Sequence, residues 1–255
     1  MVKNLERKDF FRYKIKISYD GLDYFGWQNQ PQKNTVQGEI EKALFKISGN
    51  KLITIEGSGR TDTGVHARGQ IAHFDLPKSL NANELKIALN SLLKKDIRIH
   101  SLVKTSQNFH ARYDVKSKEY RYFIYNGDVM PPNLRNYSHH EHRVLNLKKM
   151  EEAITFLIGN HDFSVFSVNP GYQIENSFRT LYKINIKKKN SMIVISVLGN
   201  GFLYKMVRSL AGFLIDIGLE KFEPSFVKNI FEQKKRDKDV KTAPSNGLFL
   251  WKVNY

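Results

Sequence analysis

The stretch KLITIEGSGRTDTGVHARGQIAHFD, residues 51–75, places two strand patterns on either side of a glycine-rich connection. Residues 51–57 and 69–75 are rich in the apolar and β-branched residues that favour strands. Residues 57–69 contain four glycines and no apolar periodicity, which is typical of a loop. The sequence therefore predicts two consecutive strands joined by this loop.

The residues around this pair complete a β-α-β-β-α-β order in the first half of the chain. Residues 13–20 and 97–103 alternate apolar and polar positions, which predicts a strand at each place. Apolar residues at helical spacing predict one helix after Asn34 and another after Asn81, and we expect these asparagines to cap them. Gly49 is expected to end the first helix.

The second half is predicted to repeat this order. The expected elements are a strand at 118–125, a helix capped by Asn146, strands at 179–188 and 192–199, a helix from Leu203 to Ile217, a helix from Pro224 and a strand at 248–255. The pattern favours an α+β fold of two ferredoxin-like halves, residues 1–110 with the glycine-rich loop and residues 111–255. We expect a mixed, mainly antiparallel sheet, with helices on one face and the other face free to receive a ligand.

Composition narrows the class of partner. The 255 residues contain 41 Lys and Arg against 25 Asp and Glu, a net charge of +16 that favours a polyanion such as RNA. No cysteine is present, which excludes disulfides and thiolate chemistry. The sequence shows no signal-peptide pattern and no apolar run of membrane-spanning length, so we expect a cytoplasmic protein with no membrane partner.

Asp62 is the single carboxylate of the glycine-rich loop, where it stands among Arg60, His66 and Arg68. An aspartate in such a loop is most often a turn cap. A turn cap needs no cationic neighbours, however, and opposite charge keeps a carboxylate ionised. An ionised aspartate can act as a nucleophile or a base. The loop lacks the lysine of a phosphate-binding P-loop, so that alternative fails.

Tyr120 and Arg208 are two further candidates. Tyr120 shares one face of its predicted strand with Tyr122 and Ile124, and it is either a core aromatic or, on the open face of the sheet, a stacking partner for an extruded base. Arg208 is predicted to lie opposite the apolar stripe of its helix. It is then either a solvated side chain or a partner for a carboxylate at the edge of a packed surface.

Other charged and histidine-rich segments favour simpler interpretations. His139, His140 and His142 lack cysteine or carboxylate partners at metal-ligand spacing, so we expect a polar surface loop and no metal. Lys187–Lys189 and the run KKRDKDVK at 234–241 are interpreted as solvated charge that could contact phosphates.

Seven ordered motifs resemble the tRNA pseudouridine synthase A family and cover nearly the whole chain. They are YDGLDYFGWQNQP (19–31), GRTDTGVHARGQIAHF (59–74), FHARYDVKSKEYRYFI (109–124), HDFSVF (161–166), FRTL (178–181), GFLYKMVRSLAGFLIDIG (201–218) and TAPSNGLFLWKVNY (242–255). The resemblance implies the pseudouridine synthase fold, with an RNA-binding active-site cleft on the face of the sheet opposite the helices. It also implies that Asp62 is the nucleophile, Tyr120 contacts the target uracil and Arg208 pairs with Asp62. Arg60 is similar to the arginine proposed to fill the stack when the base flips out, and His66 and Arg68 of the same motif are expected to contact the RNA substrate with it.

The same resemblance implies an isomerase that converts uridines 38, 39 and 40 of the tRNA anticodon stem-loop to pseudouridine. It implies a homodimer, with tRNA as its partner and no cofactor. A synthase that acts on a different uridine would share these motifs. Two other classes stay open: a noncatalytic RNA-binding module, to which Asp62 would bring nothing, and a metal-dependent nuclease, which a chelator would inactivate.

Overall fold

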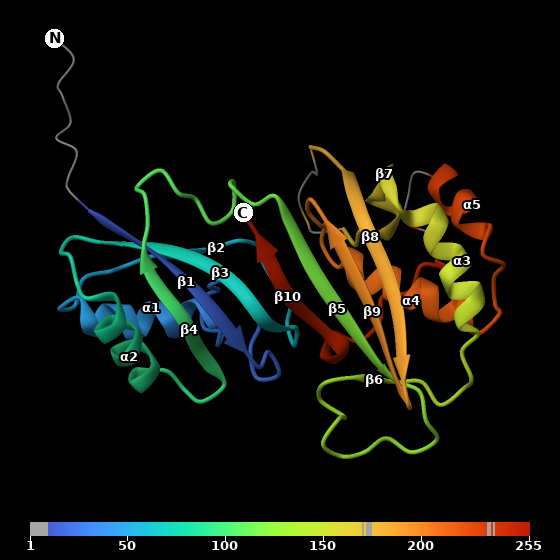
Figure 1. Cartoon of the computed structure of the whole chain (residues 1–255), viewed down its shortest axis with the longest axis horizontal. Coiled ribbons are helices and arrows are strands. Elements are labelled where there is room, and N and C mark those ends of the chain that lie inside the picture. The colour runs from blue at the N-terminus through green and yellow to red at the C-terminus, as the bar shows by residue number, and fades with distance from the viewer. Residues whose placement is uncertain (1–9, 170, 172–174, 234–235, 237) are drawn as a thin grey trace, which may run out of the picture. The chain divides into compact units, whose positions relative to one another are not determined.

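The structure is a computed structural model that describes residues 10–169, 171, 175–233, 236 and 238–255 (Figure 1). The described chain contains five α-helices and ten strands, which confirms the α+β class. It divides into two compact units. The first holds residues 10–63 and 67–115, and the second holds residues 64–66 together with the described residues from 116 onward.

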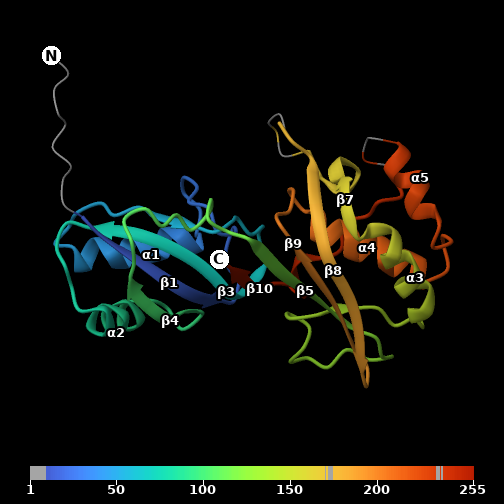
Figure 2. The same ribbon diagram turned by 45° about the horizontal axis from the view of Figure 1, so that its top comes forward.

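The first unit is a ferredoxin-like half. Its elements are β1 (Phe11–Tyr19), α1 (Val36–Ile47), β2 (Ile55–Gly57), β3 (His66–Leu76), α2 (Ala82–Leu92) and β4 (Ile97–Lys104). The strands lie in the order β4-β1-β3-β2, and every pair is antiparallel. Alternate residues of β1 are buried, so one face of this sheet carries the core. The helices α1 and α2 pack against each other beside these strands (Figures 1 and 2).

The second unit repeats the order and adds to it. Its elements are β5 (Ser117–Tyr125), β6 (His139–His140), α3 (Leu147–Leu157), β7 (Gly159–Asp162), β8 (Phe178–Lys189), β9 (Met192–Gly199), α4 (Met206–Gly218), α5 (Phe226–Glu232) and β10 (Leu248–Asn254). Short 3-10 turns at Phe163–Phe166 and Ser245–Gly247 precede β8 and β10. The strands lie in the order β10-β5-β9-β8-β7, and β6 pairs in parallel with β5.

The two units share one topology. In each, the first strand lies in the middle, flanked by the fourth strand on one side and the third on the other, and the second strand follows the third. In the second unit these four strands are β5, β8, β9 and β10, while β6, β7 and α5 are additions. The predicted pair of ferredoxin-like halves is confirmed as the fold.

Several helix starts differ from the sequence prediction. The cap of α1 is Thr35 and not Asn34, because the Thr35 hydroxyl accepts from the backbone N–H of Gly38 at 3.3 Å. The helix α4 begins at Met206 and not at Leu203, because Lys205 has a left-handed backbone with φ 58°. The last helix begins after Ser225 rather than at Pro224. Asn81 and Asn146 cap their helices as predicted.

The predicted strands are all present, but β3 begins at His66 and not at Gly69, and β6 and β7 were not predicted. The predicted strand at 51–57 is shortened to β2, whose three residues pair with β3. The glycine-rich loop therefore joins β2 to β3, as predicted.

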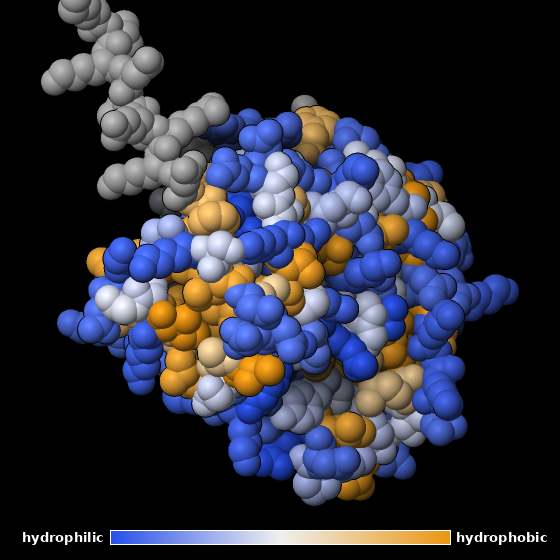
Figure 3. Space-filling view, turned by 60° about the vertical axis from the view of Figure 1, so that its left-hand side comes forward, coloured by the Kyte–Doolittle hydropathy of each residue, from blue (hydrophilic) through white to orange (hydrophobic). Residues whose placement is uncertain are grey.

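The face of the first unit that Figure 3 shows is mostly hydrophilic, with apolar residues gathered in places. Exposed apolar side chains of this unit include Leu52, Ile87 and Leu92. Within the described ranges, every helix is too short or too polar to cross a membrane.

Candidate active site

The loop between β2 and β3 carries Asp62, and it is fixed by contacts to the segment after β1. The backbone N–H of Trp27 donates to the carbonyl oxygen of Thr61 at 3.1 Å. Gly26 has a φ of +87°, and a Cβ atom there would lie 2.4 Å from the same Thr61 oxygen. Only glycine permits this close approach. The residue immediately before Asp62 is therefore held in one position.

Buried hydrogen bonds fix the loop from the opposite side. Gln70 is fully buried; its Oε1 accepts from the Ser58 hydroxyl at 2.6 Å, and its Nε2 donates to the carbonyl oxygen of Gly59 at 2.9 Å. The hydroxyls of Tyr19 and Thr61 lie 2.8 Å apart. Burial raises the pKa of Tyr19, so its hydroxyl stays protonated. These contacts stabilise the loop backbone on both sides of Arg60.

The cations of the loop have different surroundings. Arg60 is exposed and donates through Nε to the side-chain oxygen of Gln28 at 3.1 Å. Arg68 is exposed on β3. His66 is 1% exposed and stacks on Phe249, with ring centroids 4.5 Å apart. The two arginines are thus accessible to a ligand, whereas the buried ring of His66 favours a packing role over the predicted substrate contact.

Tyr120 lies on the covered face of β5. It is 7% exposed, and Tyr122 and Ile124, the next two residues on that face, are fully buried. Its ring makes an edge contact with Phe202 at a centroid distance of 5.1 Å. Of the two alternatives for Tyr120, its burial favours the core aromatic over a stacking partner on an open face, and α4 contacts β5. A buried tyrosine can wall a dry pocket but cannot offer an open stacking platform.

Arg208 lies in the first turn of α4. Twelve of the thirteen residues of this helix are buried, and Arg208 is the exception, so the helix has no polar face of the kind predicted. The Arg208 Nε donates to the carbonyl oxygen of Ala243 at 2.8 Å, and the Ala243 N–H donates back to the Arg208 carbonyl oxygen at 3.1 Å. The Tyr122 hydroxyl donates to the neighbouring carbonyl of Pro244 at 3.0 Å.

Tyr120 and Arg208 therefore belong to one unit and to one side of its sheet. Asp62, Arg60 and Arg68 belong to the other unit. Burial and the nearby charge of Arg208 act in opposite directions on Tyr122, and burial prevails, so that its pKa is raised and its hydroxyl stays protonated.

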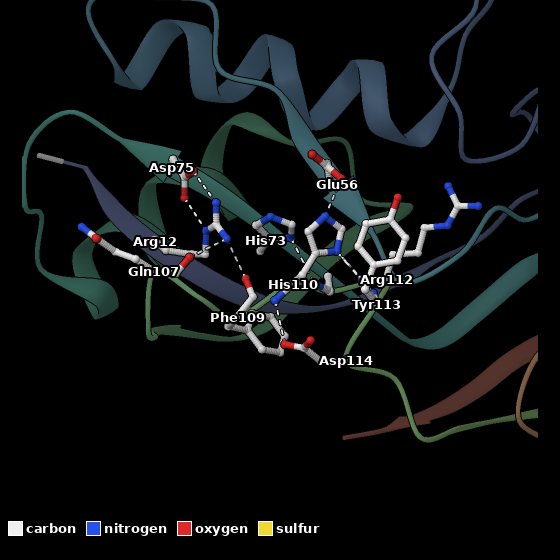
Figure 4. A network of polar contacts seen from close by, with 11 residues as sticks. Arg12, Glu56, His73, Asp75, Gln107, Phe109, His110, Arg112, Tyr113 and Asp114 are labelled. Atoms are coloured by element: carbon white, nitrogen blue, oxygen red, sulfur yellow. Dashed lines mark hydrogen bonds and ion pairs between the residues drawn. The ribbon is translucent and has the colours of Figure 1, made fainter. Parts of the chain in front are cut away.

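One cluster outside these residues has the composition of a metal site. Glu56, His73 and His110 place their ligand atoms within 4.8 Å of one another (Figure 4). The Nδ1 of His73 accepts from the Ala111 N–H, and the Nδ1 of His110 accepts from two backbone N–H groups. A neutral ring that accepts at Nδ1 carries its proton at Nε2, and the His110 Nε2 lies 3.1 Å from the Glu56 carboxylate. This proton placement favours a hydrogen-bonded cluster over a metal centre.

The same network shows how the first unit covers part of its sheet. The Arg12 guanidinium makes a paired contact with Asp75 at 2.7 Å and donates to the carbonyl oxygens of Gln107 and Phe109, both at 2.8 Å (Figure 4). The polar side of β1 is thereby joined to the segment that follows β4. These strands do not present a bare face to a ligand at this place.

The histidines singled out in the sequence make other contacts. His139 and His140 form β6, and the His140 Nε2 lies 2.8 Å from the carbonyl oxygen of Gly127. Burial lowers the pKa of His139. In the part of the chain that the structure describes, none of these histidines joins a group of metal-ligating side chains.

A depression of about 650 Å³ in the first unit lies away from the candidate residues. It is lined by α1 and by the segment around Leu52. None of the predicted site residues contributes to its wall. It is therefore not the candidate active site.

The residues Tyr19, Gln70 and Tyr122 lie within the quoted motifs, but no local pattern indicated their supporting contacts. Each of them resembles an ordinary strand residue, and each acts through contacts far away in the chain. For Gln70 the one available signal is a polar residue at a position where the strand pattern requires burial.

Comparisons with known proteins show to which family the chain is similar. The family model described as tRNA pseudouridine synthase matches residues 15–114 and 153–255. The chain is 44% identical over 246 residues to tRNA pseudouridine synthase A of Oceanobacillus iheyensis, with 96% of each chain covered. It is 42% identical over 245 residues to tRNA pseudouridine synthase A of Bacillus subtilis, with 96% of this chain and 99% of the relative covered. A crystal structure of the archaeal box H/ACA Nop10–Cbf5 complex matches 80% of this chain and 42% of its own chain at 15% identity, but its TM-score of 0.31 is too low to support an inference.

Proposed function

The chain belongs to the tRNA pseudouridine synthase family, and from this premise we propose that it isomerises uridine to pseudouridine in tRNA with Asp62 as the nucleophile. The observation that carries the proposal is the anchored loop. Thr61 is fixed through its backbone and its hydroxyl, so the carboxylate that follows it is presented from a rigid support. Preorganisation of this kind is what a reacting group needs.

The reaction rearranges the bonds of one nucleotide. The glycosidic bond between N1 and C1′ breaks, the uracil turns, and C5 bonds to C1′. The proton lost from C5 is balanced by the proton gained at N1, with no net redox change and no hydrolysis. The carboxylate of Asp62 can attack C1′, attack C6 or remove the 2′ proton, and each of these roles requires it to be ionised.

Tyr120 and Arg208 are proposed to complete the site. Tyr120 would form a wall of the uracil pocket and take part in the later proton transfer from C5. Its low exposure supports this role, because a detached uracil must be kept from water. Arg208 would pair with Asp62 and keep it charged and aimed. Its Nε contact with the Ala243 carbonyl, which holds the guanidinium group in one orientation, supports that assignment.

The remaining roles concern tRNA binding. Arg60 and Arg68 are exposed, and we assign Arg60 to filling the stack after the base flips out and Arg68 to phosphate contact. His66 retains only a supporting role beside Phe249. The net charge of +16 supports binding to a polyanion.

The finer specificity rests on the resemblance alone. We propose that the uridines modified are those at positions 38, 39 and 40 of the anticodon stem-loop, and that the enzyme acts as a homodimer without metal or organic cofactor. The cytoplasmic location expected from the sequence stays a prediction. The division into functional halves at residue 110 is also a proposal, in which the first half supplies Asp62 and the second supplies Tyr120 and Arg208.

Incubation with unmodified tRNA transcripts, followed by mapping of pseudouridine at nucleotide resolution, tests reaction and specificity together. We expect pseudouridine at positions 38 to 40, an intact tRNA chain and no effect of a chelator. Pseudouridine found only elsewhere would overturn the specificity. Cleaved tRNA, or activity lost on chelation, would overturn the proposed reaction in favour of a nuclease.

A further inference from the structure

Arg236 is a charged side chain whose surroundings differ from those predicted. It falls in the run 234–241, which the sequence indicates to be solvated charge; Lys234, Lys235 and Asp237 of that run lie outside the described residues. Arg236 is half-buried, and burial lowers the pKa of its guanidinium. Its Nη1 donates to the Ser209 hydroxyl at 2.9 Å, and its Nη2 donates to the Thr242 hydroxyl at 2.9 Å and to the Val240 carbonyl. The prediction of solvated charge is wrong at this residue.

The acceptors of Arg236 lie on two segments that are far apart in the chain. Ser209 belongs to α4, whereas Val240 and Thr242 belong to the segment Val240–Pro244, which we call the strap. The strap lies directly on α4, because a Cβ atom at Gly212 would be 2.4 Å from the Lys241 carbonyl oxygen. Arg236 therefore ties the strap to the helix that carries Arg208.

The strap in turn holds Arg208. Ala243 exchanges two hydrogen bonds with Arg208, one from its backbone N–H and one to its carbonyl oxygen. The next residue, Pro244, accepts from the Tyr122 hydroxyl. A shift of the strap would therefore move the carbonyl on which the Arg208 guanidinium rests.

We propose that Arg236 is a positioning residue for Arg208 and acts through the strap. The chemistry of the contacts suits this role. A guanidinium offers only donors in a fixed planar array, and the three atoms it meets are all oxygens, from one carbonyl and two hydroxyls. A lysine at this position could not span three acceptors in the same way. The inference rests on the proposed role of Arg208 and adds a residue that does not touch substrate.

A direct phosphate contact is the competing role for Arg236. Two features favour positioning over this alternative: the side chain is half-buried, and both of its Nη atoms are committed to protein oxygens. Lys238 provides a matched control, because it lies two residues away in the same charged run and is exposed. Loss of either side chain removes one positive charge from the same part of the chain.

The test measures the single-turnover rate of pseudouridine formation at saturating tRNA and the dissociation constant for tRNA. It compares Arg236→Ala, Arg236→Lys and Lys238→Ala, each alone and in an Arg208→Gln background. We expect Arg236→Ala to lower the rate about tenfold, since small misplacements of a reacting constellation cost that much or more. We expect tRNA affinity to change no more than in Lys238→Ala. Arg236→Lys should restore only part of the rate.

The double variants decide whether Arg236 acts through Arg208. In the Arg208→Gln background, Arg236→Ala should lower the rate less than twofold further, because residues that act as one unit are not additive. An equal loss in both backgrounds would overturn the proposal. So would an unchanged rate with weakened tRNA binding, which is the signature of a phosphate contact.

Ser209→Ala provides a milder substitution that tests the same contact if Arg236→Ala does not fold. It removes one acceptor of Arg236 and leaves the charge in place, and we expect a smaller loss of rate in the same direction, with tRNA affinity unchanged. A Ser209→Ala rate equal to that of the unsubstituted enzyme would contradict the proposal. Full activity of Arg208→Gln would instead contradict the role proposed for Arg208, which keeps the two failures apart.

Discussion

The loop that carries Asp62 and the strap that holds Arg208 are both fixed by a side chain that bridges two stretches of chain, yet the bridging groups differ. In the loop the bridge is the neutral amide of Gln70, which is fully buried. At the strap it is the guanidinium of Arg236, which is half-buried. The difference follows from the hydrogen-bonding groups with which each bridging side chain has to pair. The loop offers a hydroxyl donor and a carbonyl acceptor, which an amide matches, whereas the strap and α4 offer oxygens to a group that only donates.

Loss of the Gln70 side chain and loss of the Arg236 side chain should have different consequences. Loss of the fully buried Gln70 amide leaves the Ser58 hydroxyl and the Gly59 carbonyl without this partner, and water does not reach the fully buried Ser58. Loss of the half-buried Arg236 guanidinium leaves one acceptor, Thr242, on a residue that is itself partly exposed, although Ser209 and Val240 are buried. We therefore expect the support of the loop to contribute mainly to stability, and the support of the strap to contribute mainly to the position of Arg208.

The largest expected effect is that of removing the Asp62 carboxylate from the loop. Asp62→Asn or Asp62→Ala should lower the single-turnover rate of pseudouridine formation at least about a thousandfold, since no other group replaces a nucleophile. The dissociation constant for tRNA should stay within a few-fold, because binding comes from Lys and Arg contacts. Asp23→Asn removes an exposed carboxylate of the same unit and should leave the rate unchanged. An active Asp62→Ala enzyme would leave the noncatalytic RNA-binding module as the better account of the fold.

The next effect is on the free energy of unfolding, which should fall more when Gln70 is lost than when Arg236 is lost. Gln70→Ala should lower the free energy of unfolding by about 2 kcal/mol, because the Ser58 hydroxyl and the Gly59 carbonyl lose their buried partner. Arg236→Ala should lower it by about 1 kcal/mol or less. Denaturant unfolding of both variants checks this order, with Gln107→Ala, which truncates an exposed glutamine, as control. A larger loss from Arg236→Ala than from Gln70→Ala would reverse the comparison.

The smallest effect concerns a part of the first unit away from its loop. Burial lowers the pKa of His73, which faces Arg12, His110, Glu56 and Asp75. The unfolded chain binds a proton at this residue below about pH 6.5, before the folded chain does, so stability should fall as the pH drops through that value. Unfolding measured between pH 7.5 and about pH 5.5 should show a weaker decline in His73→Gln. His100→Gln, which removes an exposed histidine, should keep the original slope.

The sequence alone was sufficient for the topology, because the strands and helices carry clear periods. Asn81 and Asn146 were identified as caps from their position before an apolar period. At α1 the same reasoning selected Asn34, one residue before the actual cap, since Asn34 and Thr35 are both good caps and only the hydrogen bond to Gly38 decides between them.

The candidate site was predictable only where chemistry leaves a local signature. Asp62 stands out as an acid among cations, and the motif around it is specific. The face of Tyr120 could not be decided, because a period of two separates the faces of a strand without saying which one a helix covers. Arg236 could not be found in the sequence, since its partner Ser209 lies 27 residues away and a charged run gives no sign of burial.

The central proposal is that Arg208, which the strap holds, pairs with Asp62 of the loop and keeps its carboxylate ionised. Its most direct test is the pH dependence of the single-turnover rate, measured for the unsubstituted enzyme and for Arg208→Gln at saturating tRNA. An opposite charge lowers the pKa of a carboxylate, so its removal should shift the acid limb to higher pH by about one unit or more, in addition to lowering the plateau. A lower plateau with an unmoved acid limb would contradict the pairing of Arg208 with Asp62.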